Sequence, residues 1–444
     1  MTLTSTRDAA STATLSEAIA RGLAPDGGLY VPPAMPRTSP LDFDGLEALP
    51  EIAARLLRPF FAGDPLEPEL AAICAEALDV PAPVVPIDRA PGAASVLELF
   101  HGPTSAFKDF GARFLAACLA RTHRNSRATG GQGPPDRAKL TMLVATSGDT
   151  GGAVAAAFFG RSWADVALLY PKGLVSARQA QQLACWGGNV RTFAVQGTFD
   201  DCQRVVKEAM LDPALSRVRT LSSANSINIG RLLPQMSYYA AASLAIFRRE
   251  SRRPNFIVPT GNLGNAVACV WAREMGLPIG RIVLATNRNR TIVDYLERGD
   301  WRPRQSVATL ASAMDVGNPS NMERLNALFP GVENLRGHVT AHSVTDDEIR
   351  ATIGRDAAEL DRVWCPHSAA AAHVYRTVRA EDPDAHWVIV ATAHPAKFND
   401  IVEPLVGREV PIPPALERLL SLPRSEEDLI PTLDALRGRL EATG

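Results

Sequence analysis

Lys108 stands between two aromatic residues, Phe107 and Phe110, in the segment HGPTSAFKDFGARFLA. Aromatic residues at helical spacing predict a helix here, with Thr104 or Ser105 as its N-cap. A lysine in the first turn is disfavoured by the positive helix end, and aromatic neighbours remove it from water. Both effects lower the pKa of the amine and favour the neutral nucleophile that forms a Schiff base with a carbonyl. On this segment alone, an exposed lysine on an amphipathic helix is the open alternative.

Two glycine-rich loops could bind anions. TSGDTGG spans Thr146 to Gly152, and GNLGN spans Gly261 to Asn265. Each follows a predicted strand and precedes a predicted helix, so backbone N–H groups and a positive helix end converge on one point. Neither loop has the Lys-Ser/Thr ending of a P-loop or the GxGxxG pattern of dinucleotide sites. Together with the lysine, the loops predict one site for a cofactor phosphate and another for a substrate anion.

Continuous apolar runs indicate the elements that would position these loops. The predicted strands are residues 140–146, 166–170, 256–259, 282–286 and 387–392. Uninterrupted apolar strands between helices are typical of parallel sheets that helices cover on both faces. The predicted fold class is therefore α/β, with two α/β units. Residues 121–139 and 301–306 are predicted to be loops.

The first 90 residues are expected to form a mostly helical N-terminal domain. Residues 15–23 predict a short helix, and residues 29–31 predict a brief strand after a PDGG turn. The predicted division of the rest is 91–225 for a smaller α/β domain with Lys108 and the TSGDTG loop, and 226–444 for a larger one with GNLGN.

The composition excludes several classes of protein. The formal net charge is −2, so no overall field attracts nucleic acid or an anionic membrane. No apolar run is long enough to predict a membrane span. The six cysteines contain no CxxC pair and the eight histidines no HExxH pattern, so we expect neither a disulfide framework nor a metal site. With no clear targeting pattern, a cytoplasmic location is expected.

Several sequence motifs of this chain resemble those of a known enzyme family. LFHGPTSAFKDF resembles the lysine motif of the threonine synthase family, which comprises fold type II enzymes that use pyridoxal phosphate, and GLAPDGGLYVP resembles that family's N-terminal signature. Further segments similar to the family follow in the same order: TSGDTG, GTFDD (197–201), NSIN (225–228), PTGNLGN, MDVGNPSN (314–321) and TAHPAKF (392–398). The resemblance implies two α/β units with the cofactor between them.

The resemblance also implies roles for individual residues. Lys108 would be catalytic and would carry pyridoxal 5′-phosphate. The other cofactor-binding residues would be Asp149, Gly261, Asn262, Leu263, Gly264, Asn265 and Thr392, with 261–265 at the phosphate and Thr392 at the ring nitrogen. The substrate-binding residues would be Thr146, Ser147 and Thr150 at the carboxylate, and Asn225, Ser226 and Arg231 at a phosphate.

Asp149 departs from the asparagine that many relatives carry in this loop. A carboxylate there would repel a substrate carboxylate unless it were protonated or hydrogen-bonded to the cofactor's ring hydroxyl. The sequence leaves open whether Asp149 contacts the substrate or only that hydroxyl.

The activity implied by the resemblance is the conversion of O-phospho-L-homoserine and water into L-threonine and phosphate, the last step of threonine biosynthesis. The expected partner is this small substrate, without nucleic acid or membrane, for a monomer or a homodimer. Two alternatives remain: a related dehydratase or phospho-lyase, and a non-catalytic binding protein. The phosphate-binding residues argue against a dehydratase, and an intact Lys108 with GNLGN argues against the binding protein.

Other polar residues receive less reactive interpretations. Asp200 and Asp201 are predicted to cap a helix rather than to act as an acid–base pair. Cys365 and His367 have no partner at metal-ligand spacing. The residues expected to orient loops or to lie on the surface are His101, His394, Lys172, Asn318, Ser320 and Asn321.

Overall fold

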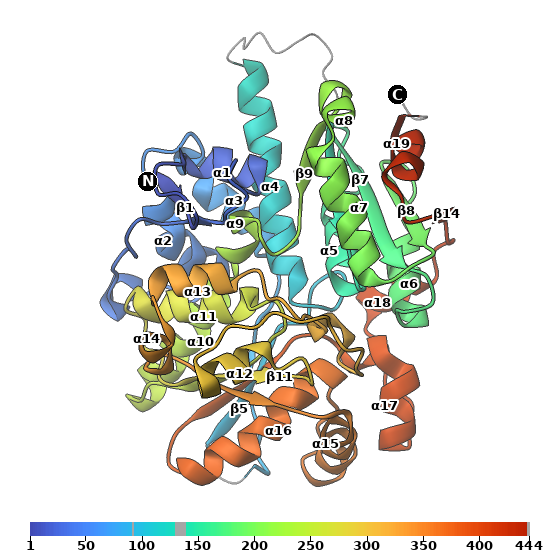
Figure 1. The fold of residues 1–444 in the computed structure, drawn as a ribbon. Coiled ribbons are helices and arrows are strands. Elements are labelled where there is room, and N and C mark those ends of the chain that lie inside the picture. The colour runs from blue at the N-terminus through green and yellow to red at the C-terminus, as the bar shows by residue number, and fades with distance from the viewer. Residues whose placement is uncertain (91–92, 129–138, 442–444) are drawn as a thin grey trace.

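The computed structural model describes residues 1–90, 93–128 and 139–441 (Figure 1). Within them lie a small N-terminal sheet, a six-stranded sheet and a five-stranded sheet. Of the predicted loop at 121–139, residues 129–138 lie outside the described part of the chain. The prediction is wrong for residues 121–128, because helix α4 (Lys108–Ala128) continues through them.

The N-terminal segment combines short strands with three α-helices. Strands β1 (Leu3–Ser5), β2 (Thr12–Ala13) and β3 (Tyr30–Val31) form an antiparallel sheet in the order β2-β1-β3. The helices are α1 (Leu15–Arg21), α2 (Leu49–Phe61) and α3 (Leu70–Ala77), with 3-10 turns η1 (Pro40–Phe43) and η2 (Glu67–Glu69). Helix α1 begins after Thr14, whose side chain forms a capping box with Glu17.

The larger sheet has the strand order β12-β11-β10-β13-β5-β4. Its strands are β4 (Val84–Pro86), β5 (Ala94–Glu98), β10 (Asn255–Pro259), β11 (Ile282–Thr286), β12 (Thr340–Ser343) and β13 (Trp387–Ala391). All neighbours pair in parallel except β4, which is antiparallel to β5. Three of these strands match predicted apolar runs to within a residue, which confirms the parallel α/β character.

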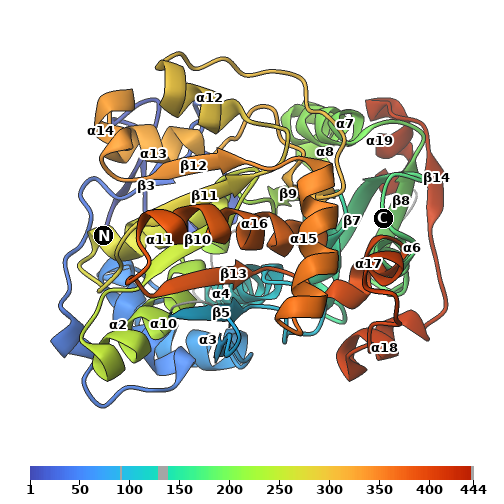
Figure 2. The same ribbon diagram turned by 90° about the horizontal axis from the view of Figure 1, so that it is seen from below.

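Both faces of this sheet are covered, as Figure 2 shows for α16 on one side of β10 and β13. Along β10, Phe256 and Val258 pack into one apolar cluster and Ile257 packs into another. The helices and turns around the sheet are α10 (Gln235–Glu250), α11 (Gly264–Glu274), α12 (Thr291–Arg298), η3 (Ser312–Met314), α13 (Met322–Leu328), α14 (Val332–Arg336), α15 (Asp346–Glu359), α16 (Pro366–Glu381), η4 (Pro395–Phe398) and α17 (Asn399–Val406). Burial on both faces explains why the strands read as continuous apolar runs.

The smaller sheet is parallel throughout, in the order β14-β8-β7-β6-β9. Its strands are β6 (Leu140–Ala145), β7 (Ala164–Pro171), β8 (Val190–Val195), β9 (Thr220–Ser223) and β14 (Glu427–Leu429). The helices that follow its strands or complete the chain are α5 (Asp149–Phe158), α6 (Ala177–Ala184), α7 (Phe199–Leu211), α8 (Pro213–Val218), α9 (Ile229–Leu232), α18 (Pro414–Leu420) and α19 (Leu433–Glu441). One apolar cluster lies between α5 and this sheet, and another joins the opposite face to α7 and α19.

The two sheets do not follow the linear division predicted at residues 90 and 225. Strand β5 lies in the larger sheet, although residues 91–225 were assigned to the smaller domain. Strand β14 lies in the smaller sheet, although it follows residue 226. Strand pairing across long sequence separations depends on tertiary packing, which no local pattern reports.

No helix among the described residues is long and apolar enough to cross a membrane. The six cysteines are free and buried.

Candidate active site

Lys108 is the first residue of α4, at the positive end of that helix. The Lys108 Nζ lies 5.7 Å from the centre of the Phe107 ring, and part of the side chain stays open to solvent. Burial lowers the pKa of Lys108 to about 8. The cations Arg231 and Lys397 act in the same direction, and Asp149 opposes them. The direction of the shift agrees with the prediction from the sequence.

The lowered pKa gives a testable pH dependence. In the cofactor-free protein, modification of Lys108 by an amine-selective reagent should be half-maximal near pH 8. An ordinary lysine would reach that point near pH 10.4. Peptide mass spectrometry across a pH series measures this directly. Modification of Lys108 only above pH 10 would show that its amine is not prepared for nucleophilic attack.

The start of α4 is tied to the end of β13. The Phe107 N–H donates to the Thr392 carbonyl oxygen over 2.8 Å, and Ala106 forms an antiparallel bridge with Ala393. These bonds place Lys108 beside Thr392, the residue expected at the cofactor's ring nitrogen. Ser105 has a left-handed backbone (φ 55°), and its buried hydroxyl has no hydrogen-bond partner among the described residues.

The predicted N-cap at Thr104 or Ser105 is wrong, because α4 begins only at Lys108. Thr104 instead donates to the Asp109 carboxylate from its backbone N–H (2.9 Å) and its hydroxyl (2.7 Å). These two bonds hold the turn that precedes the helix, so the cap-like residue stabilises the loop instead of the helix end.

The TSGDTG loop joins β6 to α5. The Thr146 Oγ1 accepts from the N–H groups of Gly148 (3.0 Å) and Gly151 (2.8 Å), and it donates to the Gly148 carbonyl oxygen (3.1 Å). The Thr146 hydroxyl therefore shapes the turn itself. Ser147 and Thr150 keep part of their surface open to solvent.

Asp149 forms a buried ion pair with Lys397. The Lys397 Nζ lies 2.8 Å from the Asp149 Oδ1, and the Gln179 Nε2 donates to the same oxygen over 3.0 Å. Burial alone would raise the pKa of the Asp149 carboxyl, but the positive charges of Lys397 and Lys108 hold it well below its usual range. Asp149 is thus ionised, and Lys397 compensates its charge.

The GNLGN loop leads from β10 into α11 and has the shape of an anion cradle. A Cβ on Gly261 would lie 2.6 Å from the Met314 Cα, so only glycine fits there. Leu263, the residue before α11, has a left-handed backbone (φ 62°), and its side chain cannot accept from the first N–H groups of the helix. Asn265 turns its side-chain oxygen toward Tyr238 (2.5 Å). The Asn265 Nδ2 has no hydrogen-bond partner among the described residues, so this donor and the backbone N–H groups of the loop are both available to a phosphate.

The NSIN segment lies against this loop. The Asn262 Nδ2 donates to the Ser226 Oγ over 2.7 Å, which joins the two proposed phosphate sites. Asn225 and Ser226 are partly exposed. The Asn225 Oδ1 is among the buried atoms that have no hydrogen-bond partner in the described chain.

Arg231 is buried beside α4. A Cβ on Gly111 would lie 2.8 Å from the Arg231 Nε, and that Nε has no hydrogen-bond partner among the described residues. Burial lowers the pKa of Arg231 to about 10, which leaves the guanidinium charged at neutral pH. A buried cation with a free donor beside Lys108 is suited to an anionic ligand.

Sequence reasoning missed three residues of this site: Lys397, Gln179 and His367. Lys397 lies inside the TAHPAKF motif, but only its burial shows that its charge matters. His367 accepts from the Ala313 N–H over 3.0 Å, and burial lowers its pKa to about 4. A neutral His367 therefore ties η3 to the first turn of α16.

The remaining polar candidates make structural contacts. Asp201 accepts from Thr198 in the capping box of α7, which confirms the helix-cap interpretation. Lys172 pairs with Asp428 at an exposed surface. His101 bonds the Glu98 carboxylate over 2.9 Å, and Asn321 donates to the Asn262 carbonyl oxygen over 2.9 Å, so both orient loops. Within the described ranges, no group of three or more potential ligands is placed to hold a metal ion.

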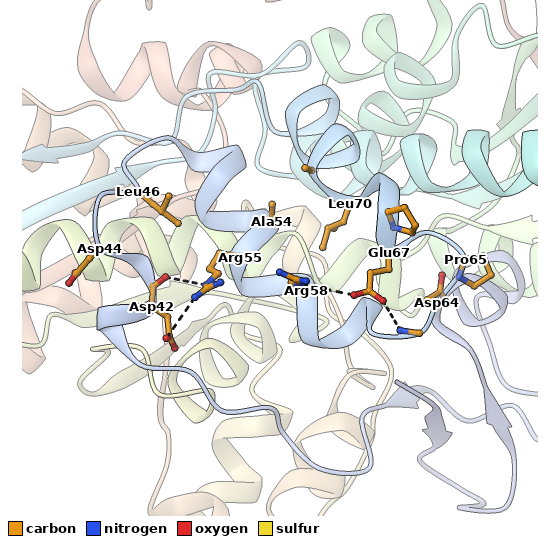
Figure 3. A pocket seen from close by; sticks show the side chains of 13 residues that line it. Asp42, Asp44, Leu46, Ala54, Arg55, Arg58, Asp64, Pro65, Glu67 and Leu70 are labelled. Atoms are coloured by element: carbon orange, nitrogen blue, oxygen red, sulfur yellow. Dashed lines mark hydrogen bonds and ion pairs between the residues drawn. The ribbon is translucent and has the colours of Figure 1, made fainter.

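A surface groove of about 1000 Å³ lies elsewhere, between η1, α2 and the start of α3 (Figure 3). Arg55 and Arg58 line it, facing Asp42 and Glu67 at 3.9 and 4.0 Å. None of its lining residues belongs to the site described above.

Comparison with known proteins gives independent evidence on the family of this chain. Residues 79–393 match a family model described as pyridoxal-phosphate dependent enzyme, residues 2–78 match the threonine synthase N terminus, and residues 368–438 match the threonine synthase C-terminal model. The chain is 38% identical over 442 residues to threonine synthase of Serratia marcescens, which covers 98% of each chain.

Solved structures agree as well. The crystal structure of threonine synthase from Escherichia coli matches with a TM-score of 0.88 and 35% identity, covering 100% of both chains. A structure of threonine synthase from Brucella melitensis with bound pyridoxal phosphate matches with a TM-score of 0.88 and 33% identity, covering 100% of this chain and 99% of that one.

Proposed function

The chain belongs to the threonine synthase family of pyridoxal-phosphate-dependent lyases, and on that premise we propose that it converts O-phospho-L-homoserine and water into L-threonine and phosphate. One observation carries the proposal: the buried Arg231, with an unpaired donor, lies against the helix that begins at Lys108. A phosphorylated amino acid can then meet the amine and the guanidinium together.

The residues present fit the cofactor. The GNLGN loop would hold its phosphate through backbone N–H groups at the start of α11, and Thr392 would face the ring nitrogen. Asp149, which its ion pair with Lys397 keeps deprotonated, would accept a hydrogen bond from the ring hydroxyl. When bound, the cofactor supplies a ring that accepts electron density from the substrate's α-carbon.

The chain's own residues divide the remaining work. Ser147 and Thr150, with the N–H groups of the α5 turn, would hold the substrate carboxylate, and Thr146 would maintain that turn. Lys108, with its pKa near neutrality, would remove the Cα proton and deliver protons to other substrate carbons within reach. Asn225, Ser226 and Arg231 would hold the substrate phosphate before and after it leaves.

Incubation with O-phospho-L-homoserine tests the function when phosphate and threonine are measured in the same sample. Equal release of both supports the proposal. Phosphate without threonine indicates a phospho-lyase, and the absence of both products from the holoenzyme overturns the catalytic assignment. The division into residues 1–90, 91–225 and 226–444, the mostly helical character of the first unit and the monomeric or homodimeric state stay predictions.

Arg231→Ala should weaken a phosphorylated substrate far more than an unphosphorylated amino acid. Loss of a buried, charged hydrogen bond costs about 1.5–3 kcal/mol, or roughly ten- to 150-fold in affinity. Isothermal titration with a phosphonate analogue and with the matching unphosphorylated amino acid measures the difference. Arg204→Ala, on the exposed face of α7, is the control. Equal losses for both ligands would place Arg231 outside the phosphate site.

A further inference from the structure

Arg324, on α13, is a fully buried arginine whose acceptors are all neutral. Its Nε donates to the Tyr30 carbonyl oxygen (3.2 Å), its Nη2 to the Ile227 carbonyl oxygen (2.7 Å) and its Nη1 to the Asn321 Oδ1 (2.6 Å). Burial lowers the pKa of Arg324 to about 9, which still leaves the side chain charged at neutral pH.

Among the residues that the structure describes, no carboxylate lies within ion-pair distance of Arg324, and its hydrogen-bond acceptors are neutral oxygens. The adjacent Glu323 attracts it electrostatically, but Glu323 points to the surface and pairs with Arg7 at 2.7 Å. A buried charge without a partner is costly, and its neighbours usually include an opposite charge, a ligand or an ion.

Hydrogen bonds connect Arg324 to both proposed phosphate loops. It bonds the Ile227 carbonyl oxygen inside NSIN and the Asn321 side chain. Asn321 in turn donates to the Asn262 carbonyl oxygen over 2.9 Å, in GNLGN. The Asn262 side chain also donates to the Ser226 hydroxyl over 2.7 Å, which links GNLGN to NSIN. Arg324 therefore contacts the backbone of the substrate-phosphate loop directly, and it reaches the cofactor-phosphate loop through Asn321.

We infer that Arg324 is a positioning residue for both phosphate groups: it fixes the two loops in register, and its charge is balanced by the phosphates that bind in front of them. This inference rests on the proposed function. It assigns to one side chain, remote in sequence from either loop, the coupling between cofactor binding and substrate-phosphate binding.

The test compares Arg324→Met and Arg324→Lys with Arg121→Met in the full-length protein. Arg121 is the matched control, since it is also largely buried but pairs with Glu69 and Glu76. Each protein is freed of cofactor and reloaded with pyridoxal phosphate, or with pyridoxal, which lacks the phosphate. The affinity of each compound is measured from the absorbance of the bound ring.

We expect Arg324→Met to bind pyridoxal phosphate at least about tenfold more weakly while pyridoxal changes little, and Arg324→Lys to recover part of the loss. In the holoenzyme, the rise in melting temperature on adding inorganic phosphate should shrink in Arg324→Met and persist in Arg121→Met. Equal weakening of both compounds, or an unchanged response to phosphate, would overturn the inference. If Arg324→Met does not fold, the same comparisons on Arg324→Lys decide.

These measurements use no amino-acid substrate. A failure to make threonine would therefore count against the proposed function alone, and an unchanged discrimination between pyridoxal phosphate and pyridoxal would count against the role of Arg324 alone.

Discussion

Replacing Lys108 with alanine should reduce turnover by about 10³-fold or more, even where pyridoxal phosphate still binds through the GNLGN loop. The side chain serves as both the amine that joins the cofactor and the group that moves protons, and proton transfer by a positioned side chain alone contributes roughly 10²- to 10⁴-fold. Its lowered pKa and its place at the start of α4 motivate the expectation.

Borohydride reduction of the holoenzyme followed by peptide mapping identifies the attachment point independently of rate. The cofactor should be found on the peptide that contains Lys108, and Lys172→Ala, at an exposed surface, should retain both attachment and activity. Lys397 is the informative alternative, because it is a second buried amine in the same site. Attachment there would contradict the assignment.

Replacing Lys397 with methionine should destabilise the holoenzyme by about 3–5 kcal/mol, because it leaves the Asp149 carboxylate buried without its partner. The Thr104 carbonyl oxygen also loses the 2.7 Å bond that it accepts from Lys397. Lys172→Met is the control: the Lys172–Asp428 pair is shorter, at 2.6 Å, but half-exposed, so its loss should cost only about 0–1 kcal/mol. Urea unfolding followed by circular dichroism compares the two.

The pH dependence has a definite sign. In the unmodified protein the pKa of Asp149 lies below its unfolded value, so the pair stabilises the fold above about pH 4, and this contribution is lost as the pH falls through the folded-state pKa. Without Lys397, burial raises the pKa of Asp149, and the carboxylate destabilises the fold most at neutral pH. The deficit should therefore shrink toward pH 4, and Lys397→Met/Asp149→Asn should regain most of it. A deficit that is equal at pH 7 and pH 4 would contradict the ion-pair explanation.

The strands with a clear local sequence pattern could be predicted. The apolar runs of β6, β10, β11 and β13 are continuous and almost entirely buried, so the sequence indicates each of them. Strands β5 and β14 were not predicted, and each pairs in a sheet formed mostly by strands from the other side of residue 225. Each pairs with a strand hundreds of residues away in the chain, and no local pattern shows that pairing.

The residues of the candidate site also fall into two groups: those that local motifs indicate and those whose role depends on the whole fold. The motifs around Lys108 and Gly261 can be recognised in the sequence, because the backbone conformation that each requires depends on residues close together in the chain. Lys397 and Arg324 could not be assigned roles, since a charged side chain acquires this importance only through burial, and burial is a property of the whole fold. Asp149 lies between these cases: its position was recognised, but its ionisation depends on a partner from η4.

The pairing of the late strand β14 with β8 affects how the chain folds during synthesis. During synthesis, β4 and β5 emerge long before β13, the other neighbour of β5, and β8 stays an open edge until residues 427–429 have left the ribosome. Open strand edges invite pairing with other chains. Neither sheet can be completed early, so the nascent chain is expected to depend on chaperones for most of its length, and a ribosome stalled before β14 should leave a product prone to aggregate.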